Sequence, residues 1–377
     1  MKPSGIRKFF DVAAAMPNCV SLGVGEPNFV TPDIARLAAI RSIADGETKY
    51  TSNSGLLELR KAISRYLQER FDLAYDPAQV IITVGVSEAI DNSLRAVLNP
   101  GDEVLIPEPC FVAYAPCVTL AGGVPVGIPC TADNGFILTP EVLEKYITDK
   151  SKLLFFPYPT NPTGGIMSKE QMEAITPVII KHDLLVLSDE VYAELTYGEK
   201  THVSIATLDG MYERTITLNG FSKAFAMTGW RIGFVAAPKE IITQVLKIHQ
   251  YAIMCAPTAA QYAALACLED GFKNNFAEVE KMKAEYDRKR KYLHTSLVEM
   301  GLSCFEPLGA FYMFPCVKST GMDGEEFANA FLQAQEVAVV PGGAFGDCGK
   351  DYIRISYAYS MEKLQIAMER MRKFLNK

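Results

Sequence analysis

The sequence predicts an α/β protein with a largely parallel central sheet and a second, smaller α/β unit. Short aliphatic runs, typical of strands that are buried on both faces, alternate with helical segments along most of the chain. Glycine and proline turns separate these segments. The 377 residues are long for one hydrophobic core, which favours a large domain with a smaller one attached.

The N-terminal part precedes this alternation. Residues 1–30 should be irregular, and a helix should follow over 33–44, with Thr31 as its cap. A polar loop that contains Tyr50 then leads to an amphipathic helix over 56–71.

The Gly-x-Gly at residues 23–25 invites a dinucleotide-binding interpretation. The third glycine of that motif is missing, and Pro27 prevents the helix that would hold a pyrophosphate. Gly25 is instead expected to bring a bare backbone N–H close to a ligand or to form a tight turn.

The alternating part supplies the predicted central sheet. Its strands are expected at 80–84, 104–106, 124–128, 153–156, 184–188, 215–218 and 234–237. The helices between them include segments ending at residue 98 and spanning 112–120 and 240–251. Ligands of a doubly wound sheet bind at the carboxyl ends of the strands, so polar residues there are the candidates for function.

The C-terminal part begins with a helix at 258–269 and a long charged helical connector at 276–300. Short strands at 309–314, 337–340 and 352–356 then alternate with helices at 324–334 and 361–376. We therefore expect a large domain over 43–280, and a small domain formed by 281–377 together with the N-terminal segment 1–42.

Composition excludes several classes of function. The net charge of −7 without a basic run argues against nucleic-acid binding. Four histidines without metal-ligand spacing argue against a metal site. Nine cysteines, an odd number without a Cys-x-x-Cys pair, indicate reduced, mostly buried thiols. Asp11 and Pro17 interrupt any signal peptide, and no apolar run is long enough to span a membrane, so a cytoplasmic protein is expected.

The stretch around Lys223 follows the strand predicted at 215–218. This lysine lies among small, aromatic and apolar residues, and desolvation favours the uncharged amine that can attack a carbonyl. Ser222 offers a hydroxyl, and Arg231 a permanent fork-shaped cation for a phosphate. A snorkelling lysine and an ion-paired arginine are the structural alternative, which these residues alone favour.

Other strand ends carry further candidates. The glycine turn at 85–88 opens a helix whose free N–H groups suit an anion, although Ser87 could simply cap that helix. Phe111 could lie against a flat ligand or pack in the core. Asp189 could meet a cofactor or form a structural ion pair. Proline density after the strand at 153–156 makes Asn161-Pro162 a candidate cis bond.

A lysine after one strand, a carboxylate after another and two phosphate-binding candidates together suit pyridoxal phosphate. Its aldehyde reacts with an amine, its ring nitrogen needs a carboxylate, and its phosphate anchors it. The sequence resembles the class I/II, fold-type I aminotransferases along essentially its whole length, most closely the aromatic or broad-specificity branch. Four ordered motifs carry the resemblance: Gly25-Glu26-Pro27, Asn161-Pro162-Thr163-Gly164, Asp189-Glu190-Val191-Tyr192 and Ser222-Lys223-x-x-x-Met227-x-Gly229-x-Arg231.

The resemblance implies roles for the catalytic residues. Lys223 would bind the cofactor aldehyde and, once released, move the proton between the substrate Cα and the cofactor. Asp189 would pair with the ring nitrogen, while Tyr192 and Asn161 would hydrogen-bond the ring hydroxylate. Phe111 would stack on the ring.

The resemblance also implies how the anions are held. The phosphate would contact the helix start and the Lys223 stretch, through Val86, Ser87, Glu88, Ser222 and Arg231. Some relatives carry another hydroxyl where this chain has Gly220, so that contact is in doubt.

Two further matches extend the implied site beyond the cofactor. Tyr50 matches a tyrosine that reaches the neighbouring subunit's phosphate, which implies a homodimer. Arg354 matches the arginine that grips the substrate α-carboxylate, with Gly25 N–H and Asn161 assisting.

The predicted function is therefore transfer of the amino group of an aromatic or broad range of L-amino acids to a 2-oxoacid, with 2-oxoglutarate as the expected acceptor. Aspartate aminotransferase and cysteine-S-conjugate β-lyase are the alternatives. A non-catalytic effector domain of a pyridoxal-dependent regulator would need a DNA-binding domain, and no room for one precedes Gly25. No residue that recognises the substrate side chain is evident from the sequence.

Overall fold

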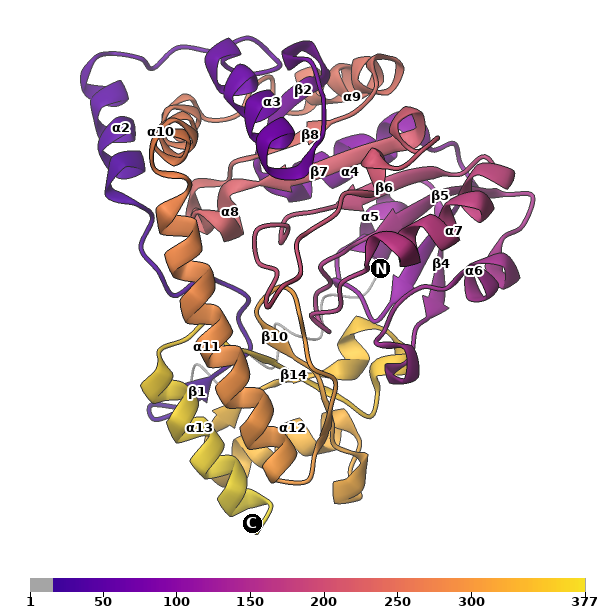
Figure 1. The fold of residues 1–377 in the computed structure, drawn as a ribbon, viewed down its shortest axis with the longest axis vertical. Coiled ribbons are helices and arrows are strands. Elements are labelled where there is room, and N and C mark those ends of the chain that lie inside the picture. Colours follow the sequence, from indigo (N-terminus) through magenta and orange to yellow (C-terminus); the bar gives the residue numbers. More distant parts are fainter. Residues whose placement is uncertain (1–15, 377) are drawn as a thin grey trace.

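The computed structural model describes residues 16–376. A seven-stranded sheet in the order β2-β8-β7-β6-β5-β3-β4 forms the centre of its larger part (Figure 1). Only β8 runs antiparallel to its neighbours, which confirms the α/β fold with a largely parallel sheet. The strands are β2 (Val80–Thr83), β3 (Glu103–Glu108), β4 (Val124–Pro129), β5 (Ser151–Phe156), β6 (Leu185–Asp189), β7 (Thr215–Gly220) and β8 (Gly233–Ala236).

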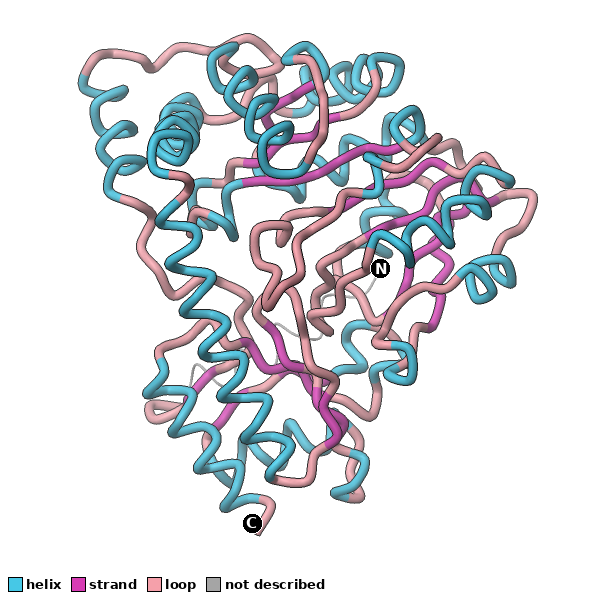
Figure 2. The backbone as a smooth tube through the Cα atoms, in the orientation of Figure 1, coloured by secondary structure: helices cyan, strands magenta, loops and turns pink. Residues whose placement is uncertain are grey.

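Helices cover both faces of this sheet, which explains why the middle residues of its strands are largely apolar (Figure 2). Alternate residues of β5 point to opposite faces: Leu153 and Phe155 join one core cluster, and Leu154 and Phe156 the other. Helices α4 (Gly85–Val97), α5 (Tyr114–Leu120) and α9 (Lys239–Ala252) pack on one face. The opposite face is covered by α3 (Leu57–Phe71), α6 (Pro140–Tyr146), α7 (Lys169–Lys181) and α10 (Thr258–Asn274).

The long helix α11 (Ala277–Glu299) runs from the region of α10 toward the C-terminus (Figure 1). Beside it lie α12 (Gly324–Gln335), α13 (Met361–Phe374) and a three-stranded antiparallel sheet of β10 (Tyr312–Met313), β14 (Ile353–Ser356) and β13 (Val340–Pro341). A separate pair joins β9 (Ser303–Cys304) to β11 (Pro315–Cys316). The N-terminal β1 (Val20–Ser21) pairs with β12 (Val337–Ala338), so the first described strand joins the C-terminal unit.

Several local predictions were wrong. Thr31 does not cap α2 (Asp33–Ala44); Pro32 occupies the cap position, and the Thr31 hydroxyl donates to Ala226 O instead. The alternative that Ser87 caps its helix is excluded, because Ser87 lies inside α4, whose cap residue is Val84. The strand predicted at 309–314 is reduced to short pieces, because the left-handed backbone of Ala310, φ 56°, interrupts an extended run.

Other predictions were incomplete. The helices α6 and α7 were not anticipated, and the helix expected over 112–120 begins at Tyr114. All nine cysteines are unpaired, but only Cys110, Cys130 and Cys267 are buried, and the others are partly exposed. Within residues 16–376, every helix is too short or too polar to cross a bilayer. The residues where a signal peptide was considered lie largely outside the described part.

Candidate active site

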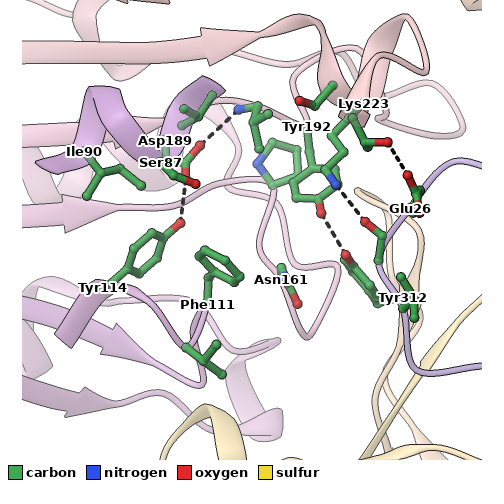
Figure 3. Close-up of a pocket in the computed structure, with 18 of the residues that line it drawn as sticks. Glu26, Ser87, Ile90, Phe111, Tyr114, Asn161, Asp189, Tyr192, Lys223 and Tyr312 are labelled. Atoms are coloured by element: carbon green, nitrogen blue, oxygen red, sulfur yellow. Dashed lines mark hydrogen bonds between the residues drawn. The ribbon is translucent and has the colours of Figure 1, made fainter. Parts of the chain in front are cut away.

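A cavity of about 590 Å³ lies at the carboxyl ends of β6 and β7, against β10 and β14 (Figure 3). It brings together eleven of the thirteen residues that the sequence predicted for the site: Gly25, Val86, Ser87, Phe111, Asn161, Asp189, Tyr192, Ser222, Lys223, Arg231 and Arg354. These residues come from segments far apart in the sequence, so the fold assembles the cavity.

Lys223 lies on the short helix α8 (Phe221–Ala224), directly after β7. Its Nζ donates a 2.7 Å hydrogen bond to the carbonyl oxygen of Gly25. Burial, with a smaller contribution from the positive charges of Arg354 and Arg231, lowers the pKa of Lys223 to about 8, against the opposite effect of Glu26. About a tenth of this amine is therefore uncharged at pH 7 and about half at pH 8, and the uncharged form is the one that a nucleophile or base requires.

Asp189 ends β6 with its side chain in the cavity and only 6% of the residue exposed. Burial raises the pKa of its carboxyl to about 6, although the Tyr114 hydroxyl at 2.8 Å and the Val191 N–H at 3.2 Å both donate to it and favour the ionised form. Tyr114 is itself fixed by stacking on Phe155. At neutral pH Asp189 is thus a buried, oriented carboxylate that can hold a cation.

Arg354 on β14 is buried beside the same cavity. One Nη donates to Asn161 Oδ1 at 2.8 Å and the other to the carbonyl of Gly23, while Nε has no partner among the described residues. The guanidinium lies 4.5 Å from the ring centroid of Tyr312. Burial lowers its pKa, and a buried donor without a partner is costly unless an anion completes it.

Tyr192 and Tyr312 share a 2.8 Å hydrogen bond between their hydroxyl groups (Figure 3). Burial raises the pKa of both phenols. Gly25 packs so closely on the Tyr312 hydroxyl that a Cβ at this position would overlap it. Tyr312 on β10 therefore fixes the Tyr192 hydroxyl by a hydrogen bond, and Gly25 of the N-terminal segment packs against Tyr312.

The start of α4 presents groups that suit an anion. Its cap residue, Val84, has no capping side chain, so the first N–H groups of the helix remain free for a ligand. Gly85 adopts φ 73°, and a Cβ there would lie 2.7 Å from an Nη of Arg231. The glycine thus permits the arginine to lie against the helix start, next to Ser87.

Two predicted site residues lie elsewhere in the single chain. The side chain of Glu88 does not line the cavity, because its carboxylate accepts hydrogen bonds from Val84, Asn92 and His249. Tyr50 is 80% exposed and lies outside the cavity. The bond Asn161-Pro162 is cis, as the sequence suggested.

The sequence did not single out several cavity residues, among them Tyr114, Tyr312, Glu26, Ile90 and Phe345. Tyr312 belongs to the aromatic run that was predicted only as a strand. Tyr114 lies three residues after Phe111, a spacing that places both side chains on one side of a helical turn. This spacing is the one local feature of the sequence that indicates Tyr114 as a cavity residue.

The fold and this cavity define an α/β enzyme with a buried amine, a buried carboxylate and two sites for anions. The chain belongs to the class I and II aminotransferases, whose family model matches residues 17–371. It is 49% identical to an aspartate aminotransferase of Pyrococcus abyssi and 46% identical to aromatic-amino-acid aminotransferase 2 of Thermococcus litoralis, each over 100% of this chain and 96% of the relative.

A solved structure agrees with this assignment. The aromatic aminotransferase of Pyrococcus horikoshii superimposes with a TM-score of 0.93 at 46% identity, over 98% of each chain. The protein is therefore a transaminase of a family that uses pyridoxal phosphate.

Proposed function

We propose that this transaminase holds pyridoxal 5'-phosphate on Lys223 and moves the amino group of an aromatic or broad range of L-amino acids to a 2-oxoacid, with 2-oxoglutarate as acceptor. The observation that carries the proposal is the unpartnered Nε of Arg354, a buried cation in the same cavity as the amine of Lys223. A substrate carboxylate would complete this guanidinium in a bidentate pair.

The residues present fit the cofactor. Bound pyridoxal phosphate supplies an aldehyde that reacts with amines and a protonated ring that accepts electrons. Asp189, ionised above about pH 6, would hold the ring nitrogen, and Phe111 would lie against the ring. Tyr192 and Asn161 would donate hydrogen bonds to the ring oxygen.

The phosphate would occupy the start of α4. The free N–H groups of Val86 and Ser87 would donate to it, together with the hydroxyl of Ser222 and the guanidinium of Arg231. The N–H of Glu88 already bonds within α4, so Glu88 would contribute by holding the turn. The close approach of Arg231 to Gly85 supports this assignment.

The substrate would bind by its α-carboxylate to Arg354, with the Gly25 N–H and Asn161 assisting. Its Cα would then lie near Lys223. With a pKa of about 8, the amine of Lys223 can take up and return the proton at that carbon near neutral pH.

Aromatic donors are favoured by the charges that line the cavity. Among the described residues, its cationic side chains are Lys223, Arg231 and Arg354, and each already has a role. The distal carboxylate of aspartate would need another cation, which would have to come from the second copy of the chain. Aspartate nevertheless remains the second candidate, because the Pyrococcus abyssi relative is named for it.

A donor panel with 2-oxoglutarate as acceptor tests this function. Phenylalanine and tyrosine should give glutamate with a kcat/KM at least about tenfold above that of aspartate. A preference for aspartate would move the assignment to the second candidate. Release of pyruvate and ammonia from cystathionine without amino transfer would instead indicate a β-lyase.

The site would be completed by a second copy of the chain. Helix α2 exposes Ile34, Leu37, Ile40 and Ile43, an apolar stripe at helical spacing, and Tyr50 lies shortly after it. We propose that this surface forms a homodimer in which Tyr50 reaches the partner's phosphate. Replacing both Leu37 and Ile40 by Glu should give monomers in light scattering; an unchanged dimer would refute the assignment.

The remaining proposals concern organisation and location. The predicted large domain over 43–280, and the small domain of 281–377 with 1–42, would meet at the cavity. A cytoplasmic location agrees with the unpaired cysteines.

A further inference from the structure

We propose that His249 is a positioning residue for the phosphate end of the cofactor, and that it acts through Glu88. The inference rests on the pyridoxal-phosphate function proposed above. Neither side chain lines the cavity, so neither contacts the cofactor directly through its side chain.

Glu88 fastens the turn that precedes the first residues of α4. One carboxylate oxygen accepts from the backbone N–H of Val84, the cap residue that lacks a side-chain cap of its own. The other oxygen accepts from Asn92 Nδ2 at 2.8 Å and from His249 Nδ1 at 2.7 Å. The carboxylate thus links the helix start, the next turn of α4 and the neighbouring helix α9.

The side chain of His249 makes one hydrogen bond, to Glu88, among the described residues. Its side chain is fully buried on α9, which packs beside α4 (Figure 1), and its Nε2 has no partner among the described residues. Burial of an imidazole with a single polar partner costs more free energy than burial of an apolar side chain. This cost is explained if the position of Glu88 matters to the enzyme.

The turn held by Glu88 has little freedom. Gly85 follows Val84, and a Cβ at Gly85 would lie 2.7 Å from an Nη of Arg231. On the other side, a Cβ at Gly233 would lie 2.9 Å from the backbone N of Val86. A shift of Val84 would therefore move the free N–H groups relative to Arg231, and the phosphate contacts would no longer converge.

A purely structural His–Glu pair would have a different signature. It would stabilise the packing of α9 on α4 and affect all ligands of the cavity equally. A positioning pair affects the phosphate contacts selectively. Pyridoxal has the same ring and aldehyde as pyridoxal phosphate but no phosphate, so the ratio of the two dissociation constants separates the explanations.

The test uses the full-length chain freed of cofactor and titrated with pyridoxal phosphate and with pyridoxal, followed by absorbance. His249→Leu should raise the Kd of pyridoxal phosphate about tenfold or more, because a hydrogen bond to a charged group is lost, and should leave the Kd of pyridoxal within about twofold. His249→Asn, whose side-chain amide nitrogen lies nearly where Nδ1 lies in histidine and can still donate to Glu88, should recover most of the affinity.

The matched control is His202→Leu. His202 is also a buried histidine, paired with Glu190 at 2.8 Å, but it lies away from the start of α4. This variant should change both dissociation constants by the same factor.

An unchanged ratio in His249→Leu would overturn the inference and leave the proposed function intact. If that variant does not fold, Glu88→Gln replaces it. The three partners of Glu88 all donate, so the amide nitrogen of glutamine would lose at least one of these hydrogen bonds. An unchanged ratio of the two dissociation constants in this variant would likewise overturn the inference. Failure of the unmodified chain to bind pyridoxal phosphate would instead refute the proposed function.

Discussion

Replacing Asp189 by Asn should stabilise the cofactor-free chain at neutral pH. Burial raises the pKa of Asp189 from 3.8 to about 6. The folded chain therefore holds this proton more tightly than the unfolded chain, and the free energy of unfolding falls as the pH rises from about 4 to about 6. A difference of about two pKa units, at about 1.4 kcal/mol each, amounts to about 3 kcal/mol above pH 6.

The Val191 N–H and the Tyr114 hydroxyl donate to different oxygens of Asp189. Asparagine keeps an oxygen for the Val191 N–H, its amide nitrogen can donate to the Tyr114 hydroxyl in turn, and it carries no charge. We expect Asp189→Asn to raise the free energy of unfolding by about 2–3 kcal/mol near pH 7.5 and by much less near pH 4. Urea unfolding followed by the fluorescence of Trp230, the only tryptophan, measures this. Both proteins must be compared at one concentration, because an oligomer's stability depends on it.

The control is Asp183→Asn, an exposed aspartate paired with Arg214, which should show no comparable gain near pH 7.5. If Asp189→Asn gives no gain at neutral pH, or an equal gain at both pH values, the buried charge is not the source of the cost. The same substitution should abolish turnover, so stability and activity are opposed at this residue.

Three further predictions concern neighbouring residues. Tyr114→Phe removes a hydrogen bond that lowers the pKa of Asp189, so in the cofactor-free chain the stability loss caused by ionisation of Asp189 should extend to a pH about one unit higher in urea unfolding. Arg354→Lys keeps the charge but cannot form a bidentate hydrogen-bonded pair with a carboxylate, and kcat/KM for amino acids should fall about 10–100-fold in steady-state assays. Gly25→Ala would overlap the Tyr312 hydroxyl and should lower kcat/KM about tenfold or more, and Tyr312→Phe in the same chain should recover part of the loss.

Each of these has a clear contrary result. An unchanged pH dependence of unfolding in cofactor-free Tyr114→Phe would show that its hydroxyl does not tune Asp189. Less than a twofold change in Arg354→Lys would exclude a bidentate pair. Additive losses in the Gly25→Ala, Tyr312→Phe double variant would show that the two residues act independently.

The residues predicted from the sequence share one physical property. Lys223, Asp189 and Asn161 each lie at or after the carboxyl end of a buried strand, and parallel strands place these ends at one edge of a sheet. Strand order did not need to be known for them to be candidates. The same reasoning found Ser87, since a glycine turn between strand and helix is a local signal.

The residues that were missed depend on contacts between distant segments. Tyr312 reaches the cavity because β10 pairs with β14 and brings it under Arg354, a contact without a local sequence pattern. Thr31 fits a helix cap by its position, yet its hydroxyl bonds to Ala226 and accepts from Trp230. Tertiary partners here outweighed the local capping preference.

The charges of the cavity also couple its two anion sites to the amine. Arg354 and Arg231 both lower the pKa of Lys223 through their positive charge. A carboxylate bound to Arg354 would offset part of that charge, so the pKa of Lys223 should rise when a carboxylate binds. The amine would thus become a stronger base once the substrate carboxylate is in place, which is when a proton must be taken from Cα.

This coupling can be measured in the cofactor-free chain by the pH dependence of Lys223 acylation, located by mass spectrometry. Saturating 3-phenylpropionate, a carboxylate without an amine, should move the midpoint of this profile to higher pH. In Arg354→Met the midpoint should already be higher and should no longer respond to the carboxylate, because the charge that depresses the pKa is gone. If 3-phenylpropionate shifts the midpoint equally in both proteins, the carboxylate binds at a place other than Arg354. If it shifts the midpoint in neither protein, burial alone sets the pKa of Lys223.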